Sequence, residues 1–248
     1  MNIVERPSPN FNERVGVSGP DILIMHYTGM QSCQAAVTRL TDAASRVSSH
    51  YTVDEDGTIY RHVAEAMRAW HAGVSHWRGE TDINSHSIGI EIHNPGHEHG
   101  YPDFPLAQMR AVIGLSKDIV KRHRMTPESV LAHSDVAPER KIDPGEKFNW
   151  AALAKAGVGV WVRPSPLQPG DRGLGPGATG PRVAEVQRHL AAYGYDAGLS
   201  GSLDTKTCKI LRAFQLHFRP RRPDGRLDRS TELTLWRLLA IVSQKEFT

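Results

Sequence analysis

Residues 163–181 constrain the fold of this chain most strongly, because they are rich in proline and glycine. Proline lacks the backbone N–H that a helix interior or a central strand needs, and glycine weakens both kinds of element. Such a composition is typical of a connecting segment. We therefore expect two units, residues 1–162 and residues 182–248, joined by a linker over residues 163–181.

The first unit alternates short apolar runs with one-sided helical patterns, after an N-terminal segment (residues 1–20) that we expect to be irregular. Apolar or alternating runs predict strands at residues 22–25, 49–53, 58–63, 87–92 and 130–133. Apolar positions at helical spacing predict helices over residues 32–46, 105–123 and 148–156. Interleaved strands and helices indicate an α/β or α+β domain, and we expect an α/β domain with a mixed central sheet flanked by helices.

The second unit contains an internal repeat. The pattern Gly-x-Leu-Asp-x-x-Thr occurs at residues 201–207 and again at residues 225–231, each time just before an amphipathic run. Asp204 and Asp228 are natural helix N-caps. A third amphipathic run begins at Val183. We therefore expect a small all-α domain of three helices, near the lower size limit for independent folding.

Charge and cysteine usage exclude some classes of function. The net charge of +3 and the isoelectric point near 8.9 are too weakly basic to indicate a nucleic-acid partner, although they are compatible with an anionic polymer. The two cysteines are far apart and match no metal or disulfide spacing. There is no apolar run of membrane-spanning length and no secretory leader pattern. We expect a cytoplasmic monomer, and the periplasm remains open if a leader has been removed.

Residues 131–145 hold several groups that suit catalysis. His133 and Asp143 are ten positions apart, and Pro138, Pro144 and Gly145 predict a turning loop without helix between and after them. Both side chains can reach one metal ion in such a loop, although an ordinary polar surface loop is an equal alternative. His26 follows an apolar strand and would alone suit a core histidine. Together, the two histidines and the aspartate match a catalytic zinc site, which has three protein ligands and one open position.

Four segments carry a family resemblance: residues 25–28 (Met-His-Tyr-Thr), 70–73 (Trp-His-Ala-Gly), 87–92 (Ser-Ile-Gly-Ile-Glu-Ile) and 132–145. Over roughly residues 15–160 the chain resembles the AmpD/AmiD-type zinc N-acetylmuramoyl-L-alanine amidases, which share a superfamily with peptidoglycan recognition proteins. The second unit, with its repeat and its Phe214-Gln215 pair, resembles a small peptidoglycan-binding domain.

The resemblance implies roles for individual residues. His26, His133 and Asp143 would bind Zn²⁺. Glu91, on a strand of apolar and small residues, would be a desolvated general base for water and then an acid for the leaving amine. Lys141 would stabilise the oxyanion. The alternatives are a solvated strand carboxylate for Glu91 and a surface lysine for Lys141.

The substrate-binding candidates are weaker, and each has a structural role as its alternative: Trp70, His71, Asn94 and Arg140. Trp offers a flat apolar face to a sugar, and Arg a planar fork to a stem-peptide carboxylate.

The resemblance implies hydrolysis of the amide between N-acetylmuramic acid, or its 1,6-anhydro form, and L-alanine. A non-catalytic peptidoglycan receptor of the same fold is the alternative, but such receptors generally lack one metal ligand and this chain has all three candidates. A phage-type endolysin would share the chemistry. A recycling role would favour soluble anhydro-muropeptides, whereas a wall-binding domain would favour intact peptidoglycan, and the sequence leaves both open.

Overall fold

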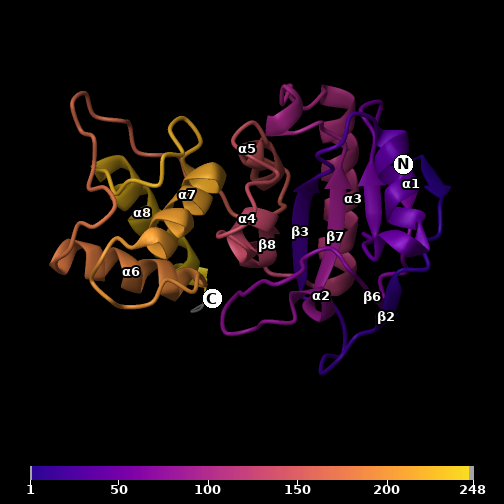
Figure 1. The fold of residues 1–248 in the computed structure, drawn as a ribbon, viewed down its shortest axis with the longest axis horizontal. Helices are drawn as coiled ribbons and strands as arrows, with labels where there is room; N and C mark the ends of the chain where they lie inside the picture. Colours follow the sequence, from indigo (N-terminus) through magenta and orange to yellow (C-terminus); the bar gives the residue numbers. More distant parts are fainter. Residues whose placement is uncertain (1, 246–248) are drawn as a thin grey trace.

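A six-stranded mixed sheet lies at the centre of the first unit in the computed structural model, which describes residues 2–245 (Figure 1). The strand order is β1-β5-β4-β7-β3-β8, in which β4 and β5 are antiparallel and the other neighbours are parallel. The strands are β1 (Ile3–Glu5), β3 (Ile22–Tyr27), β4 (Tyr51–Val53), β5 (Ile59–Arg61), β7 (Ser87–Ile92) and β8 (Val130–Ala132). A separate antiparallel pair joins β2 (Phe11–Glu13) to β6 (Met67–Ala69).

Five α-helices accompany this sheet: α1 (Cys33–Thr41), α2 (Ile83–His86), α3 (Leu106–His123), α4 (His133–Val136) and α5 (Trp150–Lys155). Single 3₁₀ turns occupy Ala43–Ser45, His97–His99 and Pro127–Ser129. The expected helix over residues 32–46 begins as predicted, with Ser32 as its N-cap, but its α part ends at Thr41. The side chain of Asp42 then accepts a hydrogen bond from the N–H of Ala44 and caps the 3₁₀ turn that follows.

Two expectations about local structure are wrong. The N-terminal segment is not irregular, because it contributes β1 and β2, two three-residue strands too short for a recognisable pattern. The loop after β8 begins with a helical turn, α4. Pro138 lies beyond the end of that turn and removes no hydrogen bond from it, and the Asp135 carboxylate accepts a bond from the Ala132 N–H at its start.

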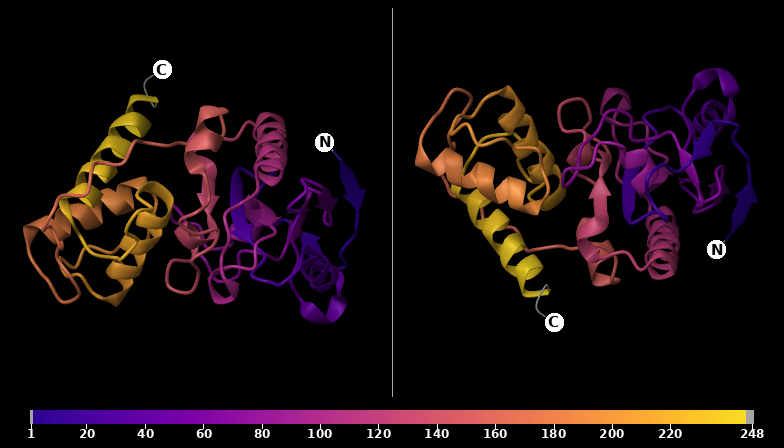
Figure 2. Two further views of the ribbon diagram at one scale, coloured as in Figure 1. Left: turned by 90° about the horizontal axis from the view of Figure 1, so that it is seen from above. Right: turned by 90° about the horizontal axis from the view of Figure 1, so that it is seen from below.

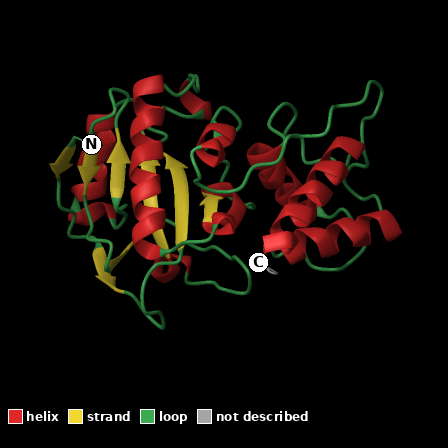
Figure 3. Cartoon of the chain, turned by 180° about the vertical axis from the view of Figure 1, so that it is seen from behind, coloured by secondary structure: helices red, strands yellow, loops and turns green. Residues whose placement is uncertain are grey.

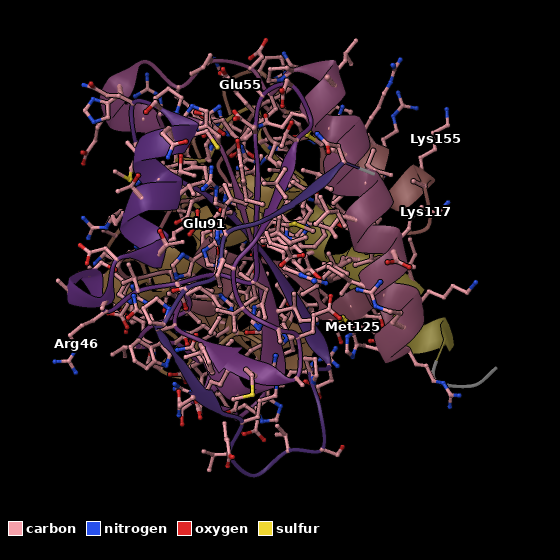
Figure 4. The ribbon with its side chains drawn as sticks, turned by 90° about the vertical axis from the view of Figure 1, so that its right-hand side faces the viewer. Arg46, Glu55, Glu91, Lys117, Met125 and Lys155 are labelled. Carbon is pink, nitrogen blue, oxygen red and sulfur yellow. The ribbon has the colours of Figure 1, made fainter. Side chains whose placement is uncertain are left out.

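The pleat of the two central strands separates the faces of the sheet. Leu23, Met25 and the three isoleucines of β7 pack with the apolar side of α3, which lies across one face (Figure 3). Ile22 and Ile24 point to the other face. By this alternation of period two, His26 on β3 and its register partner Glu91 on β7 belong to the face away from α3. Figure 4 shows Glu91 on the side that carries α1, whereas Lys117 projects from α3 on the other side.

The second unit consists of α6 (Pro181–Tyr193), α7 (Thr205–Phe218) and α8 (Arg229–Lys245), so the expectation of an α/β domain followed by three helices is confirmed. Asp204 and Asp228 cap their helices by accepting bonds of 2.7 Å from the N–H groups of Thr207 and Thr231. In each repeat a glutamine of the preceding helix accepts from the glycine N–H and donates to the threonine hydroxyl. These glutamines are Gln187 and Gln215.

The connecting segment is only partly a free connection. Leu174 and Leu227 exchange both backbone hydrogen bonds, and the N–H of Gly177 donates to the carbonyl of Leu203. The second half of residues 163–181 therefore belongs structurally to the helical unit. That unit lies beside α4 and α5 at one end of the sheet (Figures 1 and 2). Among the described residues, the helices are all too short or too polar to cross a bilayer.

Candidate active site

Three side chains from two strand ends and one loop meet beside the sheet. His26 is the penultimate residue of β3, and His133 directly follows the neighbouring parallel strand β8. Asp143 lies in the loop after α4 and is held next to both histidines by a hydrogen bond from the Ser134 N–H to its backbone carbonyl. The Nδ1 atoms of the two imidazoles are 2.9 Å apart, and the Asp143 Oδ2 atom lies 3.0 Å from His133 Nδ1 and 3.3 Å from His26 Nδ1.

The size of this triangle fits a tetrahedral cation. Three ligand atoms at about 2.0–2.1 Å from a zinc ion are about 3.3 Å from one another, close to the three distances found here. The side chains of His26, His133 and Asp143 are all buried. Burial lowers the pKa of His26 to about 4, with the neighbouring His133 as a further cause, so its imidazole is neutral near pH 7.

A chain of hydrogen bonds fixes which nitrogen of His26 carries the proton. The Ser87 hydroxyl donates to the carbonyl of Ile83 at 2.6 Å, so its oxygen accepts from Nε2 of His71 at 3.3 Å. Burial holds the pKa of His71 well below its usual value, so its Nδ1 atom is free to accept from His26 Nε2 at 3.0 Å. The lone pair of His26 Nδ1 therefore points into the triangle.

His133 is oriented in the same way from the opposite side. Its Nε2–H donates to the carbonyl of Ala72 at 3.1 Å, so in the neutral imidazole, the form that binds a metal ion, Nδ1 is the acceptor. Two nitrogen lone pairs and one carboxylate oxygen consequently face one another at hydrogen-bond distance with no proton between them. Such a donor set suits a cation, and the residues present fit a zinc ion.

A glycine makes room for the outer histidine. Gly89 lies on β7 between Ser87 and Glu91, on the same face of the sheet. A Cβ atom placed there would lie 2.5 Å from Nδ1 of His71 and 2.6 Å from its Cγ. No side chain larger than hydrogen fits beneath this ring. A glycine inside an alternating strand often marks a place where another group packs closely against the backbone. Gly89 was therefore the sequence feature from which the position of the His71 ring could have been inferred.

The carboxylate of Glu91 stands next to the triangle. Its strand pairs Glu91 directly with His26. Glu91 borders a groove of about 600 Å³ together with His133, Asp143 and Lys141. Among the described residues, the Oε2 atom of Glu91 is buried without a hydrogen-bond partner. Burial and then the charge of Asp143 raise the pKa of Glu91 well above its usual value, and Lys141 opposes them. This oxygen is therefore available to a molecule in the groove.

The four substrate-binding candidates separate in the structure. Trp70 and Arg140 border the groove, where Trp70 donates to the Asn12 amide oxygen and Arg140 donates to the backbone carbonyls of residues 72 and 74. His71 also borders the groove, but its ring nitrogens are used by His26 and Ser87. Asn94 does not reach the groove. It is 2% exposed, and its amide bonds the backbone of Gly96 and Pro102.

Several residues that line or support the groove were not predicted from the sequence. Arg39 comes from α1 and adds a third cation to those of Arg140 and Lys141. Tyr27 forms one end of a hydrogen-bonded chain through His97 to Glu146 at the rim. These partners are separated by tens of residues, and no local pattern connects them.

A His-His-Asp cluster beside the carboxylate of Glu91, at the carboxyl ends of parallel strands, is the arrangement expected of a metal-assisted hydrolase. Comparison with known proteins specifies the class further. The profile of the N-acetylmuramoyl-L-alanine amidases matches residues 17–146, and that of a putative peptidoglycan-binding domain matches residues 179–235.

Among curated proteins, the chain is 38% identical to the N-acetylmuramoyl-L-alanine amidase AmiD of Escherichia coli, over 85% of this chain and 79% of that protein. It is 32% identical to the 1,6-anhydro-N-acetylmuramyl-L-alanine amidase AmpD of Citrobacter freundii, over 58% of this chain and 84% of that protein.

Solved structures agree. AmiD of E. coli, in complex with the substrate anhydro-N-acetylmuramic acid-L-Ala-D-γ-Glu-L-Lys, matches with a TM-score of 0.76 and 34% identity, covering 94% of this chain and 98% of that one. AmpDh3 of Pseudomonas aeruginosa, in complex with anhydromuramic pentapeptide, matches with a TM-score of 0.75 and 33% identity, covering 92% and 95%. The chain belongs to the N-acetylmuramoyl-L-alanine amidase family and is an enzyme of that activity, not a non-catalytic receptor.

Proposed function

We propose that this protein uses a zinc ion, held by His26, His133 and Asp143, to hydrolyse the amide between N-acetylmuramic acid and L-alanine of the stem peptide, with the 1,6-anhydro sugar as one form of the substrate. The observation that carries the proposal is the triangle of three acceptor atoms, 2.9–3.3 Å apart, opening into the groove that Glu91 also borders. The names and bound molecules of AmiD and AmpDh3 support the choice of substrate.

The residues of this chain have distinct tasks in that reaction. Zinc in this position would polarise the scissile carbonyl and lower the pKa of water. Glu91, with its unpartnered oxygen and raised pKa, takes the proton of the attacking water and returns it to the leaving amine. Lys141 borders the same groove and places a positive charge where the carbonyl oxygen becomes negative, an effect worth about 3 kcal/mol for one such donor.

The groove suits a ligand that is part sugar and part acidic peptide. Trp70 contributes an aromatic face, and Arg39 and Arg140 contribute positive charges that can pair with stem-peptide carboxylates. We assign catalysis to residues 1–162 and propose that residues 182–248 bind peptidoglycan, which the profile match over residues 179–235 supports.

Three measurements on the purified protein test this function. We expect about one zinc per chain by elemental analysis, release of peptide from anhydro-muropeptide and from intact sacculi, and loss of both activities with a chelator and recovery with zinc. Activity that survives complete removal of metal would refute the zinc proposal. Comparing turnover on the two substrates decides between a preference for soluble fragments and a preference for the polymer.

A further inference from the structure

Asp135, the third residue of α4, carries a fully buried carboxylate. Its side chain is 0% exposed. Within the first unit, the backbone N–H of Ala132 donates to its Oδ2 atom at 2.8 Å. A buried carboxylate is costly unless several donors satisfy its oxygens.

The second unit supplies the other donors. The hydroxyl of Tyr195, just after α6, donates to Oδ1 of Asp135 at 2.5 Å. Nδ1 of His217, on α7, donates to Oδ2 at 2.7 Å. Both side chains are buried, with 3% and 1% of their surface exposed. Burial and the charge of Asp135 raise the pKa of Tyr195 well above its usual value, so its hydroxyl keeps its proton and donates.

Tyr195 and His217 are closely packed by residues of both units, so their side chains are held in place against Asp135. The ring of His217 stacks on Trp150 of α5 with centroids 3.8 Å apart. The ring of Trp77 packs edge-on against Tyr195 at 5.0 Å, and a Cβ atom added to Gly194 would lie 2.7 Å from that indole. One hydrophobic cluster runs from Ile24 of the sheet into all three helices of the second unit.

Asp135 lies close along the chain to two of the proposed metal ligands. The N–H that it accepts, that of Ala132, immediately precedes His133. The N–H of Ser134, the residue after His133, donates to the carbonyl of Asp143 at 3.0 Å. Fixing the start of α4 therefore fixes His133 directly and Asp143 through the backbone.

We propose that the second unit is a working part of the metal site: Tyr195 and His217 are positioning residues that hold Asp135, and through it the helical turn that presents His133. This inference rests on the proposed zinc role of His133. It gives residues 182–248 a task in the amidase reaction in addition to wall binding.

The test uses two variants of the full-length protein that remove a donor and keep the shape. Tyr195→Phe removes one hydroxyl oxygen, and His217→Phe keeps a ring to stack on Trp150. Arg78→Met is the matched control, because the Arg78 side chain donates across the same interface to the carbonyl of Tyr193 and does not touch Asp135. The affinity for zinc is measured by competition with a coloured chelator, and the melting temperature is measured for metal-free protein.

We expect Tyr195→Phe and His217→Phe each to weaken zinc affinity about tenfold, the lower end for outer partners of metal ligands. Activity should return when zinc is in excess, and the control should bind zinc within about twofold of the wild type. If His217→Phe does not fold, Tyr195→Phe alone decides. Wild-type zinc affinity in Tyr195→Phe, with a melting temperature lowered as in Arg78→Met, would reduce the contact to interface stability and overturn the inference. A wild-type protein that neither binds nor needs zinc would instead overturn the proposed function.

Discussion

Replacing Gly89 by alanine tests the packing behind the site with a single added carbon. The new Cβ would lie 2.5–2.7 Å from three ring atoms of His71, where ordinary contact begins near 3.4 Å. The ring must therefore move by nearly 1 Å or turn. Either change breaks the bonds of His71 to His26 and Ser87, because both nitrogens of the ring are in use.

The magnitude follows from three contributions. Two lost hydrogen bonds cost about 0.5–1.5 kcal/mol each. Overpacking a tight site costs about 1–3 kcal/mol. Alanine regains about 0.5–1 kcal/mol, because it restricts the unfolded chain more than glycine does. We expect Gly89→Ala to lose roughly 1–5 kcal/mol of unfolding free energy without metal, and to bind zinc about 10–100-fold more weakly as His26 loses its outer partner.

Urea unfolding of the metal-free protein measures the first quantity, and chelator competition measures the second. Gly19→Ala is the control, because nothing lies within 4 Å of a Cβ placed there and its backbone is not in the left-handed region. The control should leave both quantities within about 0.5 kcal/mol of the wild type. A Gly89→Ala protein with wild-type stability and zinc affinity would show that His71 does not need this space or does not orient His26.

Three other predictions concern the site and its surroundings. Glu91→Gln keeps the shape of the side chain and should retain zinc while kcat falls about 10²–10⁴-fold; near-normal turnover of muropeptide would remove Glu91 as the base. His133→Ala should lose zinc and activity together, and an unaltered zinc content by elemental analysis would exclude it from the ligands. Burial opposes ionisation of Glu65, but bonds from His123, Tyr51 and Arg122 outweigh it and lower its pKa. The ionised carboxylate of Glu65 therefore stabilises the fold above its unfolded-state pKa of about 4.3. This stabilisation is lost as the pH falls through the lower pKa of the folded state. The destabilisation caused by Glu65→Gln should therefore shrink below about pH 4.5, and a difference that stays constant from pH 7 to pH 3 would contradict this reasoning.

The sequence was informative wherever periodicity or a cap decides the local structure. The apolar run at residues 22–25 predicted β3, and Asp204 and Asp228 predicted the starts of α7 and α8. It failed where elements were too short for a period, as in β1, β2 and α4. A three-residue strand is stabilised by pairing with its neighbour and is too short to show an alternation of apolar and polar residues, so the local sequence does not predict it.

The candidate site shows the same limit at longer range. Alternation along β3 and β7 indicates which face His26 and Glu91 share, but it does not indicate which residue lies above them. His71 was expected to contact substrate, and its ring is found against His26. Asp135 gave no signal, because both of its long-range partners lie in the other unit, 60 and 82 positions away. Such contacts depend on how helices and strands pack in the folded protein. They occur at no fixed sequence separation, so a single sequence does not predict them.

The direction of the hydrogen bonds is the strongest physical reason for placing a cation in this site. Carbonyl oxygens can only accept, so the carbonyls of Ala72 and Ile83 fix the protons on His133 and Ser87 from outside. From Ser87 the order of donors and acceptors runs through His71 to His26 without a free choice. The result is three acceptors directed at one point inside the protein, an arrangement that repels itself without a positive charge at its centre. A histidine cluster held together by its own hydrogen bonds would need a proton between at least two of these atoms. When both imidazoles are neutral, as metal ligands are, their single protons are on the Nε2 atoms and none lies between the three acceptors.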